Sequence, residues 1–159
     1  MAIEETTLIR LERQLDAVDV ILGDASPTVV DTRSPSGEWS ARENLAHLAR
    51  HAELFLDRLT RILQEDRPHL GTYRAEQDPE WASWSHLPLA EVLTRLKDAR
   101  GRLIVWVRSL TADQARRSAI HPSFGEMSVS QWLEFFLLHE AHHLYLTMVR
   151  IGEARRIGS

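Results

Sequence analysis

The sequence predicts an all-α protein, a four-helix bundle with a long crossover between helices two and three. Four stretches of roughly 20 residues carry apolar side chains at intervals of three and four, the spacing of one helical face. No stretch alternates convincingly between apolar and polar residues, as a half-buried strand would. Residues 1–159, of which 43% are hydrophobic, suit one domain with a real core.

The first two helices follow from apolar spacing and from a capping pattern. The first is expected from about Glu4 to Gly23, and its buried stripe comprises Leu8, Leu11, Leu15, Val18 and Leu22. Ser40 followed by Glu43 is typical of a capping box that opens the second helix. The buried face of this helix continues through Leu45, Leu48, Ala52, Phe55, Leu59 and Leu63.

The segment from Glu65 to Leu87 has no helical periodicity and is long for a loop in a compact domain. We expect it to cross the molecule or to cover a site. Adjacent antiparallel helices need only short loops, so this connection predicts that the second and third helices run parallel. The third helix is expected from about Pro88 to Leu110, since proline suits a first helical position.

Two further capping patterns organise the last third of the chain. Thr111 with Gln114 predicts a short helix that ends near Arg117. The stretch IHPSFGEMS contains proline and glycine and predicts a turn. Ser128 with Gln131 then opens a fourth helix, expected over about 129–150.

The composition excludes several classes of function. A net charge of -4 without a block of like charges argues against a nucleic-acid-binding surface. The chain has no cysteine, so a metal would rest on histidine, carboxylate or water. The acidic N-terminal stretch is unlike a signal peptide, and the apolar runs are too short to span a membrane. We therefore expect a soluble cytoplasmic protein with neither nucleic-acid nor membrane partners.

The stretch FLLHEAHHLYL in the fourth helix carries the strongest chemical signal. His139 and His143 lie one turn apart on one face, which is a spacing that lets two ring nitrogens reach one metal ion. The alternative is a pair of core or interface histidines satisfied by hydrogen bonds. His142 lies about 60° to one side of His139 and Glu140 about 100° to the other. One helix cannot complete the coordination, so another element must supply a further ligand.

The string HEAHH also satisfies the H-E-x-x-H pattern of zinc proteases, but its surroundings do not. The 16 residues after His143 contain no histidine and only Glu153 as a carboxylate. Leu146 and Val149 stand where the extended protease pattern needs glycine and histidine. The missing ligand must therefore lie upstream.

Five histidines lie upstream of this pair. His69, His86 and His121 fall in expected loops, where a solvated histidine is ordinary. His47 and His51 form another pair on the second helix, and the apolar stripe slightly favours His51 as the one that faces the core. Spacing alone leaves both open.

Two blocks of sequence resemble the DinB/YfiT-like metal-binding four-helix bundles. They are GEWSARENLAHLARHAELFLDRL and HPSFGEMSVSQWLEFFLLHEAHHLYL. The resemblance covers nearly the whole chain and implies one DinB-like domain over residues 1–159. It also implies that His47, His139 and His143 hold a divalent ion, zinc or nickel. Tyr145 and Leu146 stand where the family often has Gly-Gln.

The resemblance implies a function as well. Members include transferases that use a low-molecular-weight thiol, so the expected activity is thiol-dependent S-transfer to small electrophiles, with the thiol as a possible cofactor. A metal-dependent hydrolase and a non-catalytic metal- or ligand-binding bundle are the alternatives. In each case the partner is a small molecule.

Other residues are expected to line or support the site, or to pack around it. They are Trp39, His51, Glu140, His142 and Arg150. From its angle, Glu140 is expected at a surface or an interface, and Arg150 at a solvated helix end or on an anionic substrate. Trp39 is expected to pack at a helix start.

The fourth helix is apolar nearly all round, so both of its sides must be covered. Opposite the histidines it carries Leu133, Leu137, Leu144 and Met148. Either the short helix near Thr111 or a second subunit must cover this side. We therefore expect a homodimer.

Overall fold

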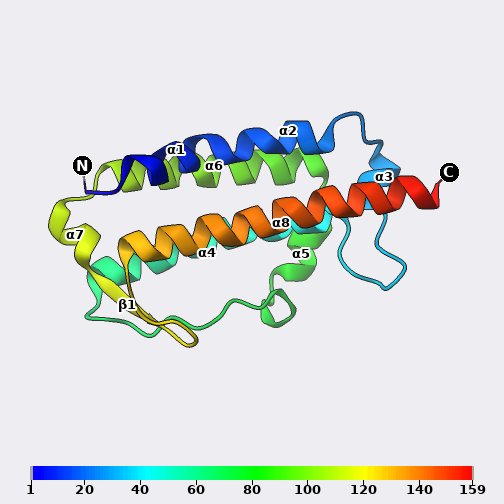
Figure 1. Ribbon diagram of the computed structural model, residues 1–159. Helices are drawn as coiled ribbons and strands as arrows, with labels where there is room; N and C mark the ends of the chain where they lie inside the picture. Colours follow the sequence, from blue (N-terminus) through cyan, green and yellow to red (C-terminus); the bar gives the residue numbers. More distant parts are fainter. Residues whose placement is uncertain (1, 159) are drawn as a thin grey trace.

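The computed structural model describes residues 2–158, which form a four-helix bundle with a small hairpin at one end (Figure 1). The first bundle position is a nearly continuous run of α1 (Glu5–Arg13), η1 (Gln14–Asp16) and α2 (Ala17–Leu22). The other three positions are α4 (Ala41–Gln64), α6 (Leu89–Arg108) and α8 (Val129–Ile157). The shorter elements are α3 (Pro27–Asp31), η2 (Ala75–Gln77), α5 (Trp81–Ser85), α7 (Ala112–Arg116), β1 (Ser118–His121) and β2 (Gly125–Ser128). The predicted fold class is confirmed.

Helices α4 and α6 run parallel, as the long connection predicted. Along both helices the colours of Figure 1 advance in the same direction, opposite to that of the first helix and α8. The starts of α4 and α6 lie together, because Arg42 Nη1 donates hydrogen bonds to the carbonyls of Ser85 and Leu87, the latter at 3.2 Å. The segment between the two helices must therefore travel the length of the bundle.

The three predicted capping boxes are present at Ser40, Thr111 and Ser128. The end of the last helix differs from the expectation, because α8 continues past Arg150 to Ile157. Arg150 is 8% exposed and forms ion pairs with Glu38 and Glu153, whose side chains are more exposed, and these pairs hold this turn. The expectation of a solvated helix end at Arg150 was wrong.

The hairpin is an element that the sequence did not predict. Its strands pair from Ser118↔Ser128 to His121↔Gly125, and Gly125 adopts a left-handed φ of 72° at the turn. Four-residue strands are too short to show a clear alternation. The outer edge of β1 also binds the crossover segment, through Leu70 N to Ile120 O at 3.0 Å and Ile120 N to Pro68 O at 2.9 Å.

The first helix covers the side of α8 that faces away from the histidines. Leu133, Leu137 and Leu144 are buried within the chain, while Met148 is 53% exposed. Gln14 Nε2 also donates to the Leu137 carbonyl at 3.0 Å. The first helix thus covers part of this side, whereas Leu138, Tyr145 and Met148 of α8 are exposed, and the homodimer stays a prediction. Across residues 2–158, no helix has both the length and the apolar character that a membrane crossing demands.

Glu140 lies in the core, which corrects the expected surface or interface role. It is 1% exposed and forms an ion pair with Arg100, and Gln14 Nε2 donates to it at 2.8 Å. Arg100 Nη1 donates in turn to the Leu11 carbonyl at 2.6 Å. Glu140 thus joins α8 to the first helix and to α6, away from the histidine face.

Replacing Glu140 by alanine is expected to destabilise the fold strongly, because it leaves the Arg100 charge buried and unpaired. The expected loss is about 3–5 kcal/mol in the free energy of unfolding, measured by urea denaturation. Glu91→Ala, which removes the exposed partner of Arg95, is the control and should cost no more than about 0.5 kcal/mol. Equal losses in the two variants would contradict this role for the buried pair.

Candidate metal centre

Three histidines from two helices converge at the centre of the bundle. His47 of α4 and His139 and His143 of α8 place one ring nitrogen each within 4.8 Å of one another. His47 Nε2 and His139 Nε2 are 3.1 Å apart. Zinc–nitrogen bonds of about 2.0–2.1 Å in tetrahedral geometry place two ligand nitrogens about 3.4 Å apart. The cluster therefore has nearly the dimensions of a metal-bound one.

The packing of α4 against α8 explains the convergence. Phe55 and Phe136 stack with ring centroids 4.6 Å apart, and both side chains are buried. One turn before Phe55 and one turn after Phe136, the side chains that meet are His51 and His139, with ring centroids 4.1 Å apart. The next turn along α4 brings in His47. The antiparallel contact thus turns two i, i+4 pairs toward each other.

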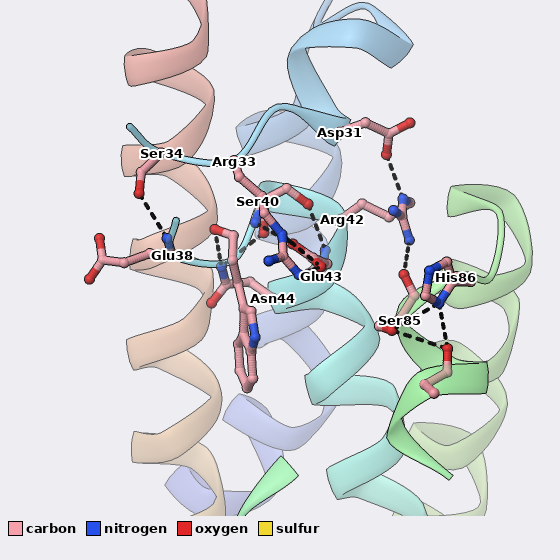
Figure 2. A network of polar contacts seen from close by, with 12 residues as sticks. Asp31, Arg33, Ser34, Glu38, Ser40, Arg42, Glu43, Asn44, Ser85 and His86 are labelled. Atoms are coloured by element: carbon pink, nitrogen blue, oxygen red, sulfur yellow. Dashed lines mark hydrogen bonds and ion pairs between the residues drawn. The ribbon is translucent and has the colours of Figure 1, made fainter. Parts of the chain in front are cut away.

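Asn44 fixes the orientation of His143. The Nδ1–H of His143 donates to Asn44 Oδ1 at 2.8 Å, which leaves the Nε2 lone pair as the metal-binding atom. Asn44 Nδ2 donates in turn to the Ser40 carbonyl at 2.9 Å and to the Trp39 carbonyl at 3.4 Å (Figure 2). These bonds determine which end of the amide faces the imidazole. Sequence reasoning missed Asn44, although its position one turn before His47 was a usable signal.

The first turn of α4 is itself firmly held. Ser40 N donates to Glu43 Oε2 at 2.8 Å, and Arg33 Nε donates to the same carboxylate at 2.9 Å (Figure 2). Although burial works against the charged form, the hydrogen bonds from Arg33 and Ser40 lower the pKa of Glu43 overall. The carboxylate is therefore ionised at neutral pH, and it anchors the turn that carries Asn44.

All three histidines are neutral at physiological pH. Burial is the main cause of their lowered pKa, which falls to about 3 for His47, about 4 for His139 and about 2 for His143. Their mutual repulsion as cations also lowers the pKa of His47 and His143. Neutral imidazoles are the form that binds a metal.

His51 lies beside the cluster but outside the converging set of nitrogens. It is 3% exposed, and its ring stacks on Phe136 at 5.8 Å. Burial lowers its pKa well below the usual value. The structure thus brings His47, rather than His51, together with the α8 pair, although the apolar stripe slightly favoured His51. The apolar stripe predicts only which residue is buried. Because His47 and His51 are both buried, it could not identify the one that joins the cluster.

The residues present fit a metal ion. Nε2 of His47 and Nε2 of His139 face each other at 3.1 Å, whereas Nδ1 of both rings is buried and has no hydrogen-bond partner within residues 2–158. Each of the three rings can turn one nitrogen lone pair toward this point, and a cation bound there would accept all three. Three imidazoles suit zinc, copper, iron or nickel.

Aromatic side chains surround the cluster on the crossover side. Trp39 lies 5.0 Å from the His47 ring and 4.9 Å from Trp81, and Tyr73 stacks on His47 at 5.4 Å. Tyr73 and Trp81 belong to the crossover segment, which was expected to cross the molecule or to cover a site. Trp39 does more than pack at a helix start, because it contacts the histidines directly.

Asp78 attaches the crossover segment to α4. It accepts hydrogen bonds from Arg50 Nε at 2.7 Å and from the Tyr73 hydroxyl at 3.0 Å. The Arg50 bond is the main cause of its lowered pKa. Burial and the bond to Asp78 together raise the pKa of Tyr73, so the phenol stays protonated. Tyr73 is thereby held against His47.

The remaining candidate residues lie apart from the cluster. His142 is exposed, with its ring 5.2 Å from that of His143. His69 and His86 are exposed, and His121 is buried in the hairpin, where its Nδ1 accepts from Ser123 N at 3.0 Å. A cavity of about 370 Å³ adjoins the cluster and is lined by Trp39, Asn44, Leu146 and Arg150, among others. Arg150 thus borders the site while its charge is matched by Glu38 and Glu153.

Comparison with known proteins agrees with this geometry. The sequence pattern of the DinB superfamily matches residues 10–146. A protein of Oceanobacillus iheyensis is 28% identical over 72% of this chain and 66% of its own length, and one of Halalkalibacterium halodurans is 28% identical over 67% and 61%. Both are named as inferred metal-dependent hydrolases. This chain spans slightly less than two thirds of these two relatives.

A solved structure shares the fold. YfiT from Bacillus subtilis superposes with a TM-score of 0.74 over 97% of this chain and 87% of its own, at 23% sequence identity. It is described as an inferred metal-dependent hydrolase with an unusual four-helix bundle topology. The parallel pair formed by α4 and α6 is a departure from the simple up-and-down arrangement.

The lowered histidine pKa values predict that the metal-free protein loses stability as the pH falls. Below about pH 6.5 the unfolded chain binds protons at these histidines while the folded chain does not, so the free energy of unfolding decreases with falling pH. Each histidine contributes about 1.4 kcal/mol per pH unit until its folded pKa is reached. Urea denaturation between about pH 7.5 and about pH 5 measures this slope. His139→Ala should reduce it, and an unchanged slope would contradict the prediction.

Removing the Asn44 side chain is expected to weaken metal binding. Asn44→Ala should lower the affinity by about 10–100-fold, because the His143 imidazole loses the bond that orients it. Competition with a chelator of known affinity measures the change. Asn44→Asp keeps an acceptor oxygen toward His143 and should retain more of the affinity than alanine does. If alanine binds metal as tightly as asparagine, the orienting role is wrong.

Proposed function

The chain belongs to the DinB superfamily, and we propose that it is a metal-dependent hydrolase of a small molecule, with His47, His139 and His143 as the protein ligands. The convergence of three neutral nitrogens is the observation that carries this proposal. Metal-dependent hydrolysis is also the activity inferred in the names of its relatives.

The site resembles catalytic metal sites more than structural ones. Structural zinc sites use four protein ligands, whereas catalytic sites use three and leave a position for water or substrate. His139 and His143 are only partly buried, so the cluster is not fully enclosed by the protein. The cavity of about 370 Å³, which meets the cluster through Trp39 and Asn44 and not through the histidines themselves, gives room for a small substrate.

The chain's own residues supply positioning and partial exclusion of water. A divalent ion in such a site acts as a Lewis acid that polarises a carbonyl or phosphoryl group and makes water more acidic. Asn44 holds His143 with Nε2 turned inward, and Trp39 and Tyr73 pack against His47. These aromatic rings limit the access of water to the cluster from the crossover side. A substrate would therefore approach the cluster from another direction.

S-transfer with a low-molecular-weight thiol is the second candidate from the sequence. The absence of cysteine is compatible with an external thiol, but no contact among the described residues favours a thiol over water. We therefore propose hydrolysis ahead of thiol-dependent S-transfer. A non-catalytic binding bundle would use the same three ligands without turnover.

Metal analysis of the purified protein tests the shared premise. One divalent ion per chain is expected, and His139→Ala should lose most of it because one of the three ligands is gone. His142→Ala, an exposed neighbour on the same helix, is the matched control and should keep the metal. Unchanged metal content in His139→Ala would remove that residue from the site.

A panel of small esters, amides and phosphoesters tests the reaction. Hydrolysis should stop on chelation and return when zinc or nickel is added back. A parallel panel of electrophiles with low-molecular-weight thiols separates the transferase from the hydrolase. Metal-dependent consumption of thiol without hydrolysis would replace the proposal, and the absence of both activities would favour the binding bundle.

A further inference from the structure

Arg58 lies on the face of α4 that carries the buried histidine His51. Seven residues separate the two, which is two turns and places them within about 20° of each other around the helix. Arg58 is partly buried, and its Nη2 donates to the Gly71 carbonyl of the crossover segment at 2.5 Å.

Arg58 has no carboxylate partner within residues 2–158, which separates it from most other buried or partly buried arginines. Arg50, Arg100 and Arg150 each form an ion pair with an aspartate or a glutamate. Arg117 also lacks an ion pair, but two of its nitrogens donate to the carbonyls of Ile62 and Glu65. A partly buried guanidinium with one carbonyl acceptor keeps several donors and its full charge for a ligand.

Three histidines lie within the electrostatic reach of Arg58. Burial is the main cause of the lowered pKa of His51, His121 and His139, and the positive charge of Arg58 contributes to the lowering in all three. These histidines belong to α4, β1 and α8. Phe135 of α8 lies between two of them, 5.3 Å from the His121 ring and 6.5 Å from the His139 ring.

A groove of about 410 Å³ lies between α4 and the crossover segment beside Arg58. Its lining includes four arginines, Arg50, Arg58, Arg61 and Arg74, against two aspartates, Asp57 and Asp78. Arg50 is paired with Asp78 and Glu80, and Arg61 with Glu65, which leaves Arg58 and Arg74 as the arginines of this groove without an ion-pair partner within residues 2–158.

Tyr73 connects this groove with the histidine cluster. It lines the groove, and its ring stacks on His47 at 5.4 Å and lies 6.0 Å from the ring of His51. A ligand in the groove would thus be separated from the cluster by one aromatic side chain.

We propose that Arg58 and the groove beside it form a subsite for an oxoanion, the carboxylate or phosphate group of the molecule that is processed at the histidine cluster. The planar guanidinium fork matches both groups, since each presents two oxygens to parallel N–H donors. The link to the cluster rests on the proposed function, whereas oxoanion binding at Arg58 does not.

Anion titration of the chelator-treated protein tests the subsite without any metal. Inorganic phosphate and acetate are added in separate titrations at constant ionic strength, and nitrogen–proton resonances of ¹⁵N-labelled protein are followed. We expect saturable shifts of the Arg58 Nε–H resonance and of amides near Gly71 and Tyr73. The stronger of the two ligands identifies the kind of oxoanion. Shifts confined to other parts of the chain, or none at all, would overturn the proposal.

Variants separate a specific subsite from general attraction to positive charge. Arg58→Gln should weaken binding about tenfold or more, as expected for loss of a charge-assisted pair of hydrogen bonds. Arg61→Gln is the matched control, because Arg61 lines the same groove but is exposed and paired with Glu65. An equal loss in the two variants would contradict the subsite.

A conservative variant keeps the test decisive if glutamine disturbs the fold. Arg58→Lys retains the charge but not the fork, so it should bind more weakly than the unmodified protein and more tightly than Arg58→Gln. Thermal denaturation establishes that each variant is folded. Failure of anion binding in a protein that still binds one metal ion would refute the subsite and leave the proposed function standing, so the two failures are distinguishable.

Discussion

Helices α4 and α8 pack antiparallel through stacked aromatic and imidazole rings, and the position of every metal-binding nitrogen follows from that contact. Phe55 against Phe136 and His51 against His139 set the register of the two helices. A shift of one helical turn, about 5.4 Å, would separate His47 from the α8 pair by more than a metal ion can bridge. The buried Glu140–Arg100 pair holds the opposite side of α8 against α6 and the first helix.

The helices and their starts were predictable because they depend on local sequence. Ser40, Thr111 and Ser128 each combine with a residue three positions later, and each opens a helix as expected. The parallel course of α4 and α6 followed from the length of one connection. The hairpin was not predictable, because its pairing depends on four-residue strands and on an edge that binds the crossover segment.

Within the site, the spacing of His139 and His143 predicted that both face one metal position. The periodicity of the second helix could not select His47 over His51. Both are buried, so an apolar stripe on one helix cannot distinguish a ligand from its neighbour. Glu140 was misplaced for a related reason. An angle measured from His139 along α8 alone does not reveal that the first helix supplies Gln14 and that α6 supplies Arg100 as partners.

The cap of α4 and the ligand His143 are joined through a single side chain, since Asn44 bonds to both. Helix ends open more readily than helix centres, often without global unfolding. Opening of this first turn would release Asn44 and free His143 to rotate while His47, deeper in the helix, stays in place. The lifetime of a bound ion would then follow the fraying of one helical turn, so Ser40, Glu43 and Arg33 would control metal exchange without touching the metal.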